Sequence, residues 1–221
     1  MEIKDMLKHV DHTQLQAFCS WADIEKLCKE AMEYETASVC IPPAYVERVH
    51  EQFGNRINIC TVIGFPLGYQ VTEAKVAEAK TAIKQGCNEI DMVINITDVK
   101  NGLYDKVEEE IRTLKEACGD HILKVIIETC YLTTEEKIAM CKAVTNAGAD
   151  YIKTSTGFGT GGATIEDVKL FKEHIGPDVK IKAAGGVSSI EDLRAFLELG
   201  CDRIGTSRAI GLCKGELTKG Y

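Results

Sequence analysis

The sequence predicts an α/β fold: a single (β/α)8 TIM barrel domain, residues 1–221, with parallel strands and a short N-terminal helix. Helical and strand patterns alternate along the whole chain. The strand segments are short, apolar and rich in β-branched residues, which is typical of parallel strands buried on both faces. Eight strand–helix units fit into 221 residues without a linker-like stretch between them. An open doubly wound sheet would satisfy the same alternation.

The expected elements follow one another at regular spacing. Strands are expected at residues 10–15, 37–41, 57–63, 89–94, 122–127, 151–154, 179–183 and 203–205. Amphipathic helices are expected at residues 22–34, 42–53, 72–84, 98–117, 133–146, 164–174 and 188–198. Proline is tolerated in the first turn of the second of these helices. The Thr-Thr-Glu-Glu string at 133–136 is typical of a capped helix start.

A repeated joint between helix and strand favours the closed barrel. Residues 86–91, 148–153 and 200–205 read Gly-Cys-Asn-Glu-Ile-Asp, Gly-Ala-Asp-Tyr-Ile-Lys and Gly-Cys-Asp-Arg-Ile-Gly. Each begins with a glycine, which suits a helix end because it accepts positive φ. Repetition of one joint favours a symmetric fold. It also places Asp91, Lys153 and Gly205 at one depth, near the strand ends where barrel enzymes carry their catalytic groups.

Composition excludes several classes of protein. The net charge of −8 argues against a non-specific nucleic-acid binder or a polybasic membrane binder. No apolar run approaches the roughly 18 residues of a spanning helix, and residues 1–10 are too charged for a signal peptide. The ten cysteines form no CxxC pair, and the five histidines show no HxH or HExxH spacing. We therefore expect a cytoplasmic protein with reduced, mostly buried cysteines and no metal site.

Two lysines at expected strand ends are the leading candidates for chemistry. Lys153 lies in Tyr-Ile-Lys-Thr-Ser-Thr-Gly, and Lys182 lies in Lys-Ile-Lys-Ala-Ala-Gly-Gly. A charged amine inside a barrel is costly unless it is paired. Either both lysines reach solvent or pair with Asp91, or one of them is a neutral nucleophile that attacks a carbonyl.

The energetics explain why two lysines are more informative than one. An ordinary lysine, with a pKa of about 10.4, is only about 0.04% neutral at pH 7, and a pKa of about 7 requires on the order of 4.6 kcal/mol. A second ammonium about 6 Å away, at an effective dielectric constant of about 20, supplies roughly 2.8 kcal/mol. Partial desolvation can supply the remainder.

Other charged residues on the strands have less specific expected roles. Asp91 is suited either to proton transfer or to the role of a counter-ion. Lys124 and Glu128 share a face of the fifth strand, and we expect them to pair inside the barrel, with Lys124 structural. His12, next to Asp11, is expected to be a hydrogen-bonding core residue.

Glycine-rich segments follow the late strands at residues 157–162, 185–186 and 205–207. Glycines let backbone N–H groups converge on an anion, and barrels often bind phosphate after strands seven and eight. We predict a phosphate site here rather than three simple tight turns.

Taken together, these strings resemble the deoxyribose-phosphate aldolases, a family of class I aldolase barrels. The resemblance covers residues 10–13, 38–42, 62–68, 89–95, 124–129, 151–162 and 182–187, and is most specific around Asp91 and Lys153. It implies reversible cleavage of 2-deoxy-D-ribose 5-phosphate to acetaldehyde and D-glyceraldehyde 3-phosphate, in deoxyribonucleoside catabolism. It also implies a homodimer or homotetramer, and a reaction that needs no cofactor.

The resemblance implies a role for each candidate residue. Lys153 would form the Schiff base, Lys182 would be the cation that lowers the pKa of the nucleophile, and Asp91 would relay protons with ordered water. The implied phosphate contacts are Gly157, Gly185, Gly186, Gly205 and Ser207. Further candidates for the site are Asp11, Cys40, Arg208 and the C-terminal Tyr221. Arg208 stands where family members often have serine, and Tyr221 resembles the end of the family's tail. Cys40 ends the second expected strand, where enal side products of acetaldehyde could alkylate its thiol.

Two other functions stay open on the residues alone. An isomerase or epimerase of a sugar phosphate would share the phosphate loops but would need an acid–base pair instead of an imine. A non-catalytic sugar-phosphate sensor would bind the ligand without turnover.

Overall fold

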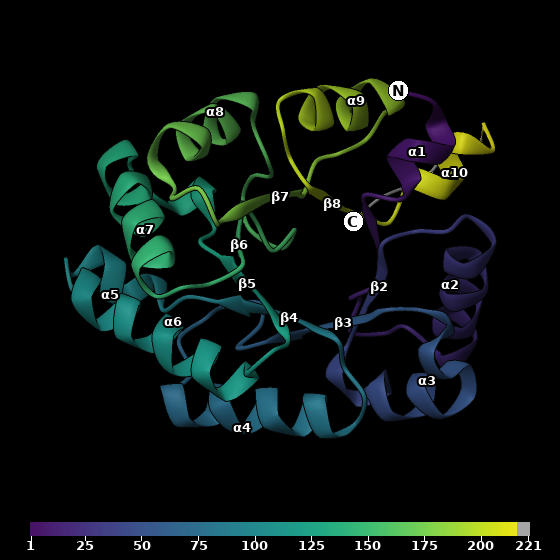
Figure 1. Ribbon diagram of the computed structural model, residues 1–221, viewed down its shortest axis with the longest axis horizontal. Helices are drawn as coiled ribbons and strands as arrows, with labels where there is room; N and C mark the ends of the chain where they lie inside the picture. Colours follow the sequence, from purple (N-terminus) through teal and green to yellow (C-terminus); the bar gives the residue numbers. More distant parts are fainter. Residues whose placement is uncertain (216–221) are drawn as a thin grey trace.

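The computed structural model describes residues 1–215 and shows a closed barrel of eight parallel strands, paired in sequence order (Figure 1). The strands are β1 Val10–Thr13, β2 Ser38–Ile41, β3 Ile59–Ile63, β4 Glu89–Val93, β5 Ile122–Ile126, β6 Tyr151–Lys153, β7 Lys180–Ala184 and β8 Arg203–Thr206. Each expected strand overlaps one of these, so the predicted (β/α)8 barrel is confirmed.

Helices form a ring outside the strands (Figure 1). They are α1 Ile3–Leu7, α2 Trp21–Glu33, α3 Val46–Phe53, α4 Thr72–Lys84, α5 Ile96–Lys100, α6 Tyr104–Cys118, α7 Thr134–Asn146, α8 Ile165–His174, α9 Ile190–Glu198 and α10 Ala209–Cys213. Single 3-10 turns are η1 Pro43–Tyr45, η2 Gly54–Arg56 and η3 Thr129–Tyr131. The expected short N-terminal helix is α1, which contacts α9 and α10. Within residues 1–215, no helix is long and apolar enough to cross a membrane.

Two expected helices are shorter than the sequence pattern predicted. The helix expected at 98–117 is divided into α5 and α6, because Gly102 adopts a φ of +71°. The backbone N–H of Leu103 closes the turn on the carbonyl of Asp98 at 2.9 Å. The helix expected from residue 42 begins instead as the turn η1, and Pro42 is extended, because a residue that precedes a proline disfavours the helical region.

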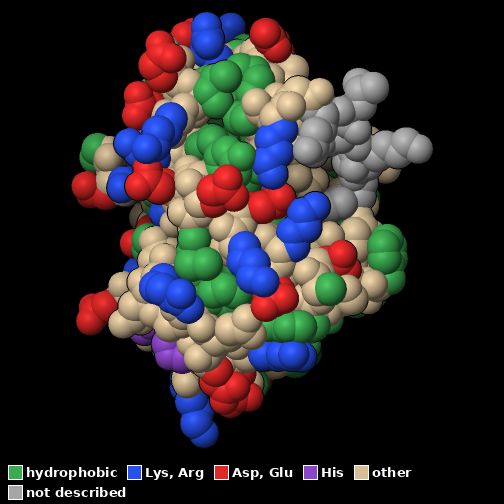
Figure 2. Space-filling view, turned by 90° about the vertical axis from the view of Figure 1, so that its right-hand side faces the viewer, with side chains coloured by type: hydrophobic (Ala, Val, Ile, Leu, Met, Phe, Trp, Pro, Cys, Tyr) green, Lys and Arg blue, Asp and Glu red, His purple; other side chains and the backbone are tan. Residues whose placement is uncertain are grey.

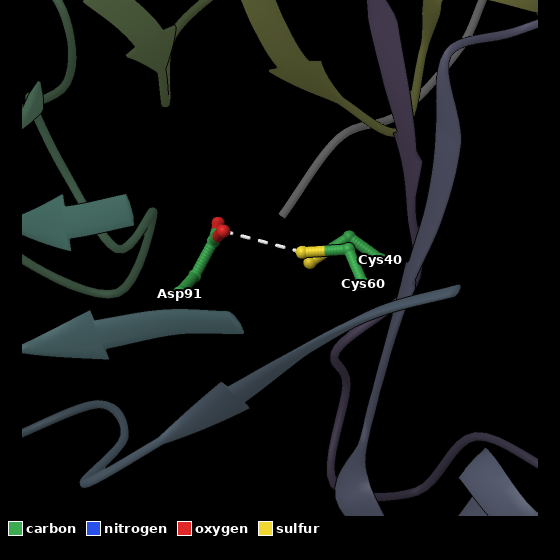
Figure 3. A group of neighbouring side chains, drawn as sticks. All are labelled: Cys40, Cys60 and Asp91. Atoms are coloured by element: carbon green, nitrogen blue, oxygen red, sulfur yellow. Dashed lines mark hydrogen bonds between the residues drawn. The ribbon is translucent and has the colours of Figure 1, made fainter. Parts of the chain in front are cut away.

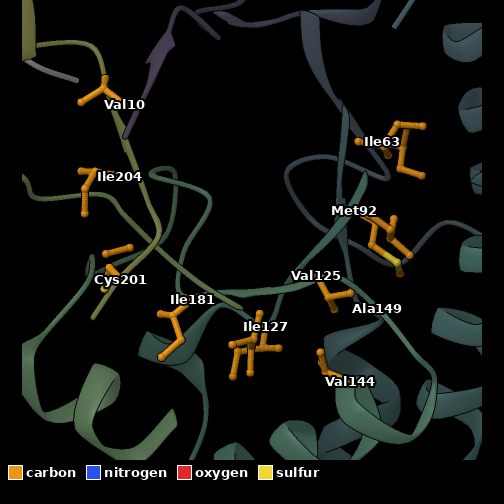
Figure 4. Close-up of a cluster of buried hydrophobic side chains, with 14 of the residues drawn as sticks. Val10, Ile63, Met92, Val125, Ile127, Val144, Ala149, Ile181, Cys201 and Ile204 are labelled. Carbon is orange, nitrogen blue, oxygen red and sulfur yellow. The ribbon is translucent and has the colours of Figure 1, made fainter. Parts of the chain in front are cut away.

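Alternation along the strands separates an apolar surface from a polar interior. The outward-facing side chains pack under the helices, and Figure 4 shows Val10, Ile63, Met92, Val125 and Ile204 among the members of this cluster. Successive strand residues point to opposite faces. The residues between these apolar ones therefore fill the barrel.

The strand register arranges the inward-facing residues in layers. Cys40 is paired with Cys60, Asp91 with Lys124, and Lys153 with Lys182. In a barrel of this type each layer holds four side chains from alternate strands, and the register advances by about one residue per strand. The lower layer is Ser38, Glu89, Tyr151 and Arg203; the middle layer is Asp11, Cys60, Lys124 and Lys182; the upper layer is Cys40, Asp91, Lys153 and Gly205.

This arrangement confirms that Asp91, Lys153 and Gly205 lie at one depth. It also shows an unusual interior, because bulky branched residues dominate the layers of most such barrels. Here charged groups occupy all three layers.

Candidate active site

Asp91 lies at the centre of a buried network of charges. Its Oδ2 atom lies 2.7 Å from the Nζ atoms of both Lys153 and Lys182, and its Oδ1 atom lies 2.9 Å from Nζ of Lys124. Burial raises the pKa of Asp91, but the three lysines outweigh it and hold the pKa well below its ordinary value. Asp91 is therefore a carboxylate at neutral pH.

Lys182 lies between two carboxylates. It contacts Asp91 and, at closer range, Oδ2 of Asp11. Burial lowers the pKa of Lys182, but Asp11 and Asp91 raise it above its ordinary value. Lys182 thus carries a positive charge beside Lys153, since both amines share one oxygen of Asp91.

Asp11 is the second buried carboxylate of the network. It accepts a hydrogen bond from Oγ of Ser38 at 2.8 Å and one from Nη1 of Arg203 at 2.5 Å. Burial raises its pKa, but Lys182, Lys124 and Arg203 together lower it well below the ordinary value. The candidate Asp11 therefore contacts Lys182 and holds it in place; within residues 1–215 it has no contact with Lys153.

The expected pairing of Lys124 with Glu128 is wrong. Lys124, in the middle layer, contacts one carboxylate of each layer: Glu89 at 2.6 Å, Asp91 at 2.9 Å and Asp11 at 3.5 Å. Glu128 follows the end of β5, where its φ of +52° takes it out of the strand's alternation. Its carboxylate accepts hydrogen bonds from the backbone N–H, at 3.2 Å, and the hydroxyl of Thr156.

Two members of the network, Glu89 and Arg203, were not predicted from the sequence. The guanidinium group of Arg203 binds both carboxylate oxygens of Glu89, at 2.9 and 2.8 Å. A signal for them was present in the repeat, because each stands two residues before a residue placed inside the barrel, Asp91 or Gly205. A period of two puts them on the same inward face.

His12 points away from this interior. Its Nε2 atom lies 3.0 Å from the carboxylate of Glu30 on α2, which confirms the expected hydrogen-bonding role.

The charges of the inward-facing residues do not balance when all are ionised. Four are cationic, Lys124, Lys153, Lys182 and Arg203, and three are carboxylates, Asp11, Glu89 and Asp91. Lys124 contacts three carboxylates, and Lys182 and Arg203 contact two each. Lys153 contacts one. It is therefore the amine with the fewest carboxylate contacts in these layers.

A pocket opens at the carboxyl ends of the strands, and Lys153 lies in its wall. The five residues predicted to bind phosphate all line it: Gly157, Gly185, Gly186, Gly205 and Ser207. Arg208 lines it as well. Within the described chain, no group accepts a hydrogen bond from the backbone N–H of Gly157, Gly185, Gly186 or Ser207. Donors that face a pocket in this way suit an anion.

The loops that carry these donors hold one another in position. The backbone N–H of Ala163 donates to the carbonyls of Ala184 and Gly185 at 3.1 and 3.0 Å. A Cβ atom on Gly162 would lie 2.4 Å from the carbonyl carbon and oxygen of Gly185, so only glycine fits there without a shift. The two loops thus form one wall of the pocket.

Cys40 and Arg208, two further candidates for the site, have defined positions in the structure. Cys40 belongs to the upper layer, is 1% exposed and packs with Leu15, Cys60 and Val62. The backbone N–H of Arg208 donates to the hydroxyl of Thr206 at 3.1 Å, at the start of α10. Tyr221 lies outside the described residues.

Two sets of ligand atoms in the barrel are close enough to hold a metal ion. They are Cys40, Cys60 and Asp91, and Asp11, Cys60 and Glu89, each with its atoms within 4.8 Å of one another. Amines already lie against both sets: Lys124 contacts all three carboxylates. A metal ion would have to displace these cations.

The face of the molecule in Figure 2 shows no large patch of basic side chains alone that would by itself attract a phosphate. On the face in Figure 2, acidic and basic side chains are interspersed with hydrophobic ones. The anion site is therefore a local feature, made largely of backbone amides.

The comparison with known proteins agrees with this geometry. The family model described as DeoC/LacD family aldolase matches residues 5–216. The chain belongs to this family of aldolases. As a DeoC/LacD aldolase it is an enzyme of the lyase class, and the resemblance to deoxyribose-phosphate aldolases is confirmed.

Relatives of this aldolase match it over nearly their full length. A deoxyribose-phosphate aldolase from Clostridium botulinum (strain Alaska E43 / Type E3) is 70% identical over 221 residues, which is 100% of both chains. The solved structure of QR15, an aldolase, has a TM-score of 0.91 at 37% identity, over 96% of this chain and 95% of that chain. The tetrameric deoxyribose phosphate aldolase from Aeropyrum pernix has a TM-score of 0.87 at 28% identity, over 97% and 92%.

Proposed function

We propose that the chain is a deoxyribose-phosphate aldolase that cleaves 2-deoxy-D-ribose 5-phosphate through a Schiff base on Lys153. The observation that carries the proposal is the position of Lys153 between the pocket and the buried charges. Lys153 has one carboxylate neighbour, lines the pocket and lies beside the permanent cation Lys182. A relative that is 70% identical bears the same activity in its name.

In the first half of the reaction, the neutral amine of Lys153 attacks the aldehyde carbon of the sugar. A proton passes to the carbonyl oxygen, and loss of water gives a protonated imine. Lys182, which shares one oxygen of Asp91 with Lys153, places a second positive charge beside the reacting amine. Asp91, 2.7 Å from Lys153, accepts the proton that the amine loses.

In the second half, the imine accepts the electron pair of the bond between C2 and C3. The hydroxyl on C3 loses its proton as that bond breaks, and D-glyceraldehyde 3-phosphate leaves. The two-carbon enamine then takes a proton on C2, and water releases acetaldehyde and restores the amine. Asp91, acting through ordered water, is placed to return the proton.

The glycine loops give the substrate its orientation. The donors of Gly157, Gly185, Gly186 and Ser207, with Gly205 lining the same wall, would hold the phosphate away from the reacting carbon. Contacts with the phosphate then position the aldehyde carbon close to the amine of Lys153. Arg208, which lines the same pocket, would add a guanidinium group that can donate two parallel hydrogen bonds to the phosphate.

Borohydride trapping tests the proposal. Reduction of the enzyme in the presence of acetaldehyde should fix a two-carbon adduct on Lys153, and peptide mass spectrometry should locate it. No adduct, or one on Lys124, would overturn the assignment. Interconversion of pentose phosphates without carbon–carbon cleavage would indicate an isomerase, and binding without turnover would indicate a sensor.

Assembly, location and pathway extend the same proposal. We propose a cytoplasmic homodimer or homotetramer, built from one barrel domain of residues 1–221, that acts in deoxyribonucleoside catabolism. The tetrameric relative from Aeropyrum pernix supports an oligomer. Light scattering at micromolar concentration distinguishes the dimer and the tetramer from a monomer.

A further inference from the structure

Two cysteines in the barrel have no part in the proposed reaction. Cys40 on β2 and Cys60 on β3 are register partners, and they belong to the upper and middle layers. Figure 3 shows their sulfur atoms close together, with Cys60 pointing to Asp91. The two Sγ atoms and a carboxylate oxygen of Asp91 lie within 4.8 Å of one another.

The backbone geometry permits a bond between the two sulfur atoms. Neighbouring strands lie about 4.7–4.9 Å apart, and a disulfide takes Cα atoms separated by about 4.4–6.8 Å. Registered residues on neighbouring parallel strands project their side chains in the same direction. A disulfide between Cys40 and Cys60 thus needs side-chain rotation and little movement of the strands.

The charges around the pair favour oxidation. Cys60 donates to Asp91 at 3.2 Å, and Nζ of Lys124 donates to its sulfur at 3.3 Å. The neighbouring Cys60 lowers the pKa of Cys40 although burial and Asp91 raise it, and Lys182 and Lys153 lower it further. Burial and Asp91 hold the pKa of Cys60 well above its ordinary value, so Cys40 is the thiol that reacts first. The thiolate is the form that reacts with oxidants. Burial instead raises the pKa of Cys28, Cys141 and Cys201 to about 12.

We propose that Cys40 and Cys60 form a redox modification site, at which hydrogen peroxide produces a disulfide that reversibly inactivates the enzyme. The thiolate of Cys40 attacks peroxide, the O–O bond breaks, and a sulfenic acid and a hydroxide form; the hydroxide takes a proton to become water. The sulfur of Cys60 then attacks the sulfenic sulfur. The S–S bond forms, the S–O bond breaks, and the hydroxyl leaves as water with the proton of Cys60.

Peroxide can reach the pair from the pocket. Leu15 belongs to the same buried cluster as Cys40 and also lines the pocket, so the shortest path for peroxide passes this side chain. Peroxide is no larger than the aldehyde that the proposed function brings to Lys153.

Charge favours the disulfide over a metal ion as the modification of this pair. Lys124 already contacts the carboxylates that a divalent ion would need, and the ion would have to displace it. The disulfide is neutral. It removes the hydrogen bond from Cys60 to Asp91, the residue that contacts Lys153.

The test begins with the reduced full-length protein, treated with increasing hydrogen peroxide. Remaining thiols are blocked with N-ethylmaleimide, and the digest is examined by mass spectrometry. We expect a linked peptide that contains Cys40 and Cys60, lighter by two hydrogen atoms. We expect aldolase turnover to fall about tenfold, the effect of one lost hydrogen bond to a buried charge, and dithiothreitol to restore it.

Two variants test whether the disulfide between Cys40 and Cys60 causes the reversible inactivation. In Cys60→Ala no disulfide can form, so we expect peroxide inactivation that dithiothreitol no longer fully reverses. Cys19→Ala, which lacks a partly exposed thiol outside the barrel, should respond as the parent does. Loss of activity without the linked peptide, or the linked peptide without loss of activity, overturns the proposal. The peptide is detected without turnover, so failure of the proposed function leaves that half of the test intact.

Discussion

The charged residues inside this barrel compensate one another's buried charge. Arg203 shows this most clearly, because it links Asp11 and Glu89 at the level farthest from the pocket. Burial lowers the pKa of Arg203, but Asp11 and Glu89 raise it above its ordinary value. The arginine is therefore structural, and its loss would leave two buried carboxylates short of a partner.

We expect Arg203→Met to reduce the free energy of unfolding by about 3–5 kcal/mol, the cost of leaving buried charges without compensation. Urea unfolding followed by circular dichroism measures it. Arg194→Met is the matched control, since Arg194 is exposed on α9 and should change stability by less than about 0.5 kcal/mol. Equal effects of the two substitutions would show that the network contributes little.

The sequence allowed only part of this site to be predicted. Lys153, Lys182 and Asp91 could be placed together, because period two and the repeat fix which residues point inward and at what depth. Which partners a long charged side chain contacts could not be predicted in that way. Lys124 crosses from its own layer to three carboxylates, and Glu128 leaves its strand's alternation through a positive φ.

At the scale of elements, strands were easier to predict than helix ends. Each of the eight strands has at least one apolar residue on its outward face, which makes the strands visible in the sequence. The break between α5 and α6 depends on one glycine, Gly102, within an otherwise helical pattern. A single glycine is tolerated in many helices, so local pattern alone does not locate such a break.

The loops after β6 and β7 behave as one element, because Gly162 fits directly against Gly185. We expect Gly162→Ala to push the second loop outward and to misplace the phosphate donors. The KM for deoxyribose 5-phosphate should rise about tenfold, which corresponds to about 1.4 kcal/mol of lost binding. Steady-state kinetics with deoxyribose, which lacks the phosphate, should show a much smaller change.

Gly161→Ala is the control from the same loop. Its Cβ atom would meet only the Cβ of Cys130, at 3.2 Å, well away from Gly185. The KM for the phosphorylated substrate should stay within about twofold of the parent, since the phosphate donors are not displaced. A similar rise in both variants would indicate that the loop as a whole, and not its contact with Gly185, governs binding.

The whole molecule combines an apolar shell with a charged interior, and this combination determines its response to acid. Asp11 and Asp91 have folded-state pKa values well below the ordinary value of 3.8, because lysine and arginine surround them. A lowered pKa means that the unfolded chain binds protons more readily than the folded chain. The stabilisation is present above pH 3.8 and is lost as the pH falls below it. Burial raises the pKa of Glu128, so the contribution of this residue to stability increases as the pH falls.

We therefore expect the free energy of unfolding to fall steeply as the pH is lowered from 4.5 to 2.5, by about 1.4 kcal/mol per pH unit for each such carboxyl. Urea unfolding across this range measures the slope. Asp11→Asn removes one of the two carboxyls, so its slope should be smaller by that amount even though the variant is less stable at neutral pH. Asp192→Asn, half-buried at the start of α9, should reduce the slope less, because solvent partly screens its hydrogen bonds to Ser188 and Ser189. An unchanged slope in Asp11→Asn would mean that the interior charges do not control the acid stability of the barrel.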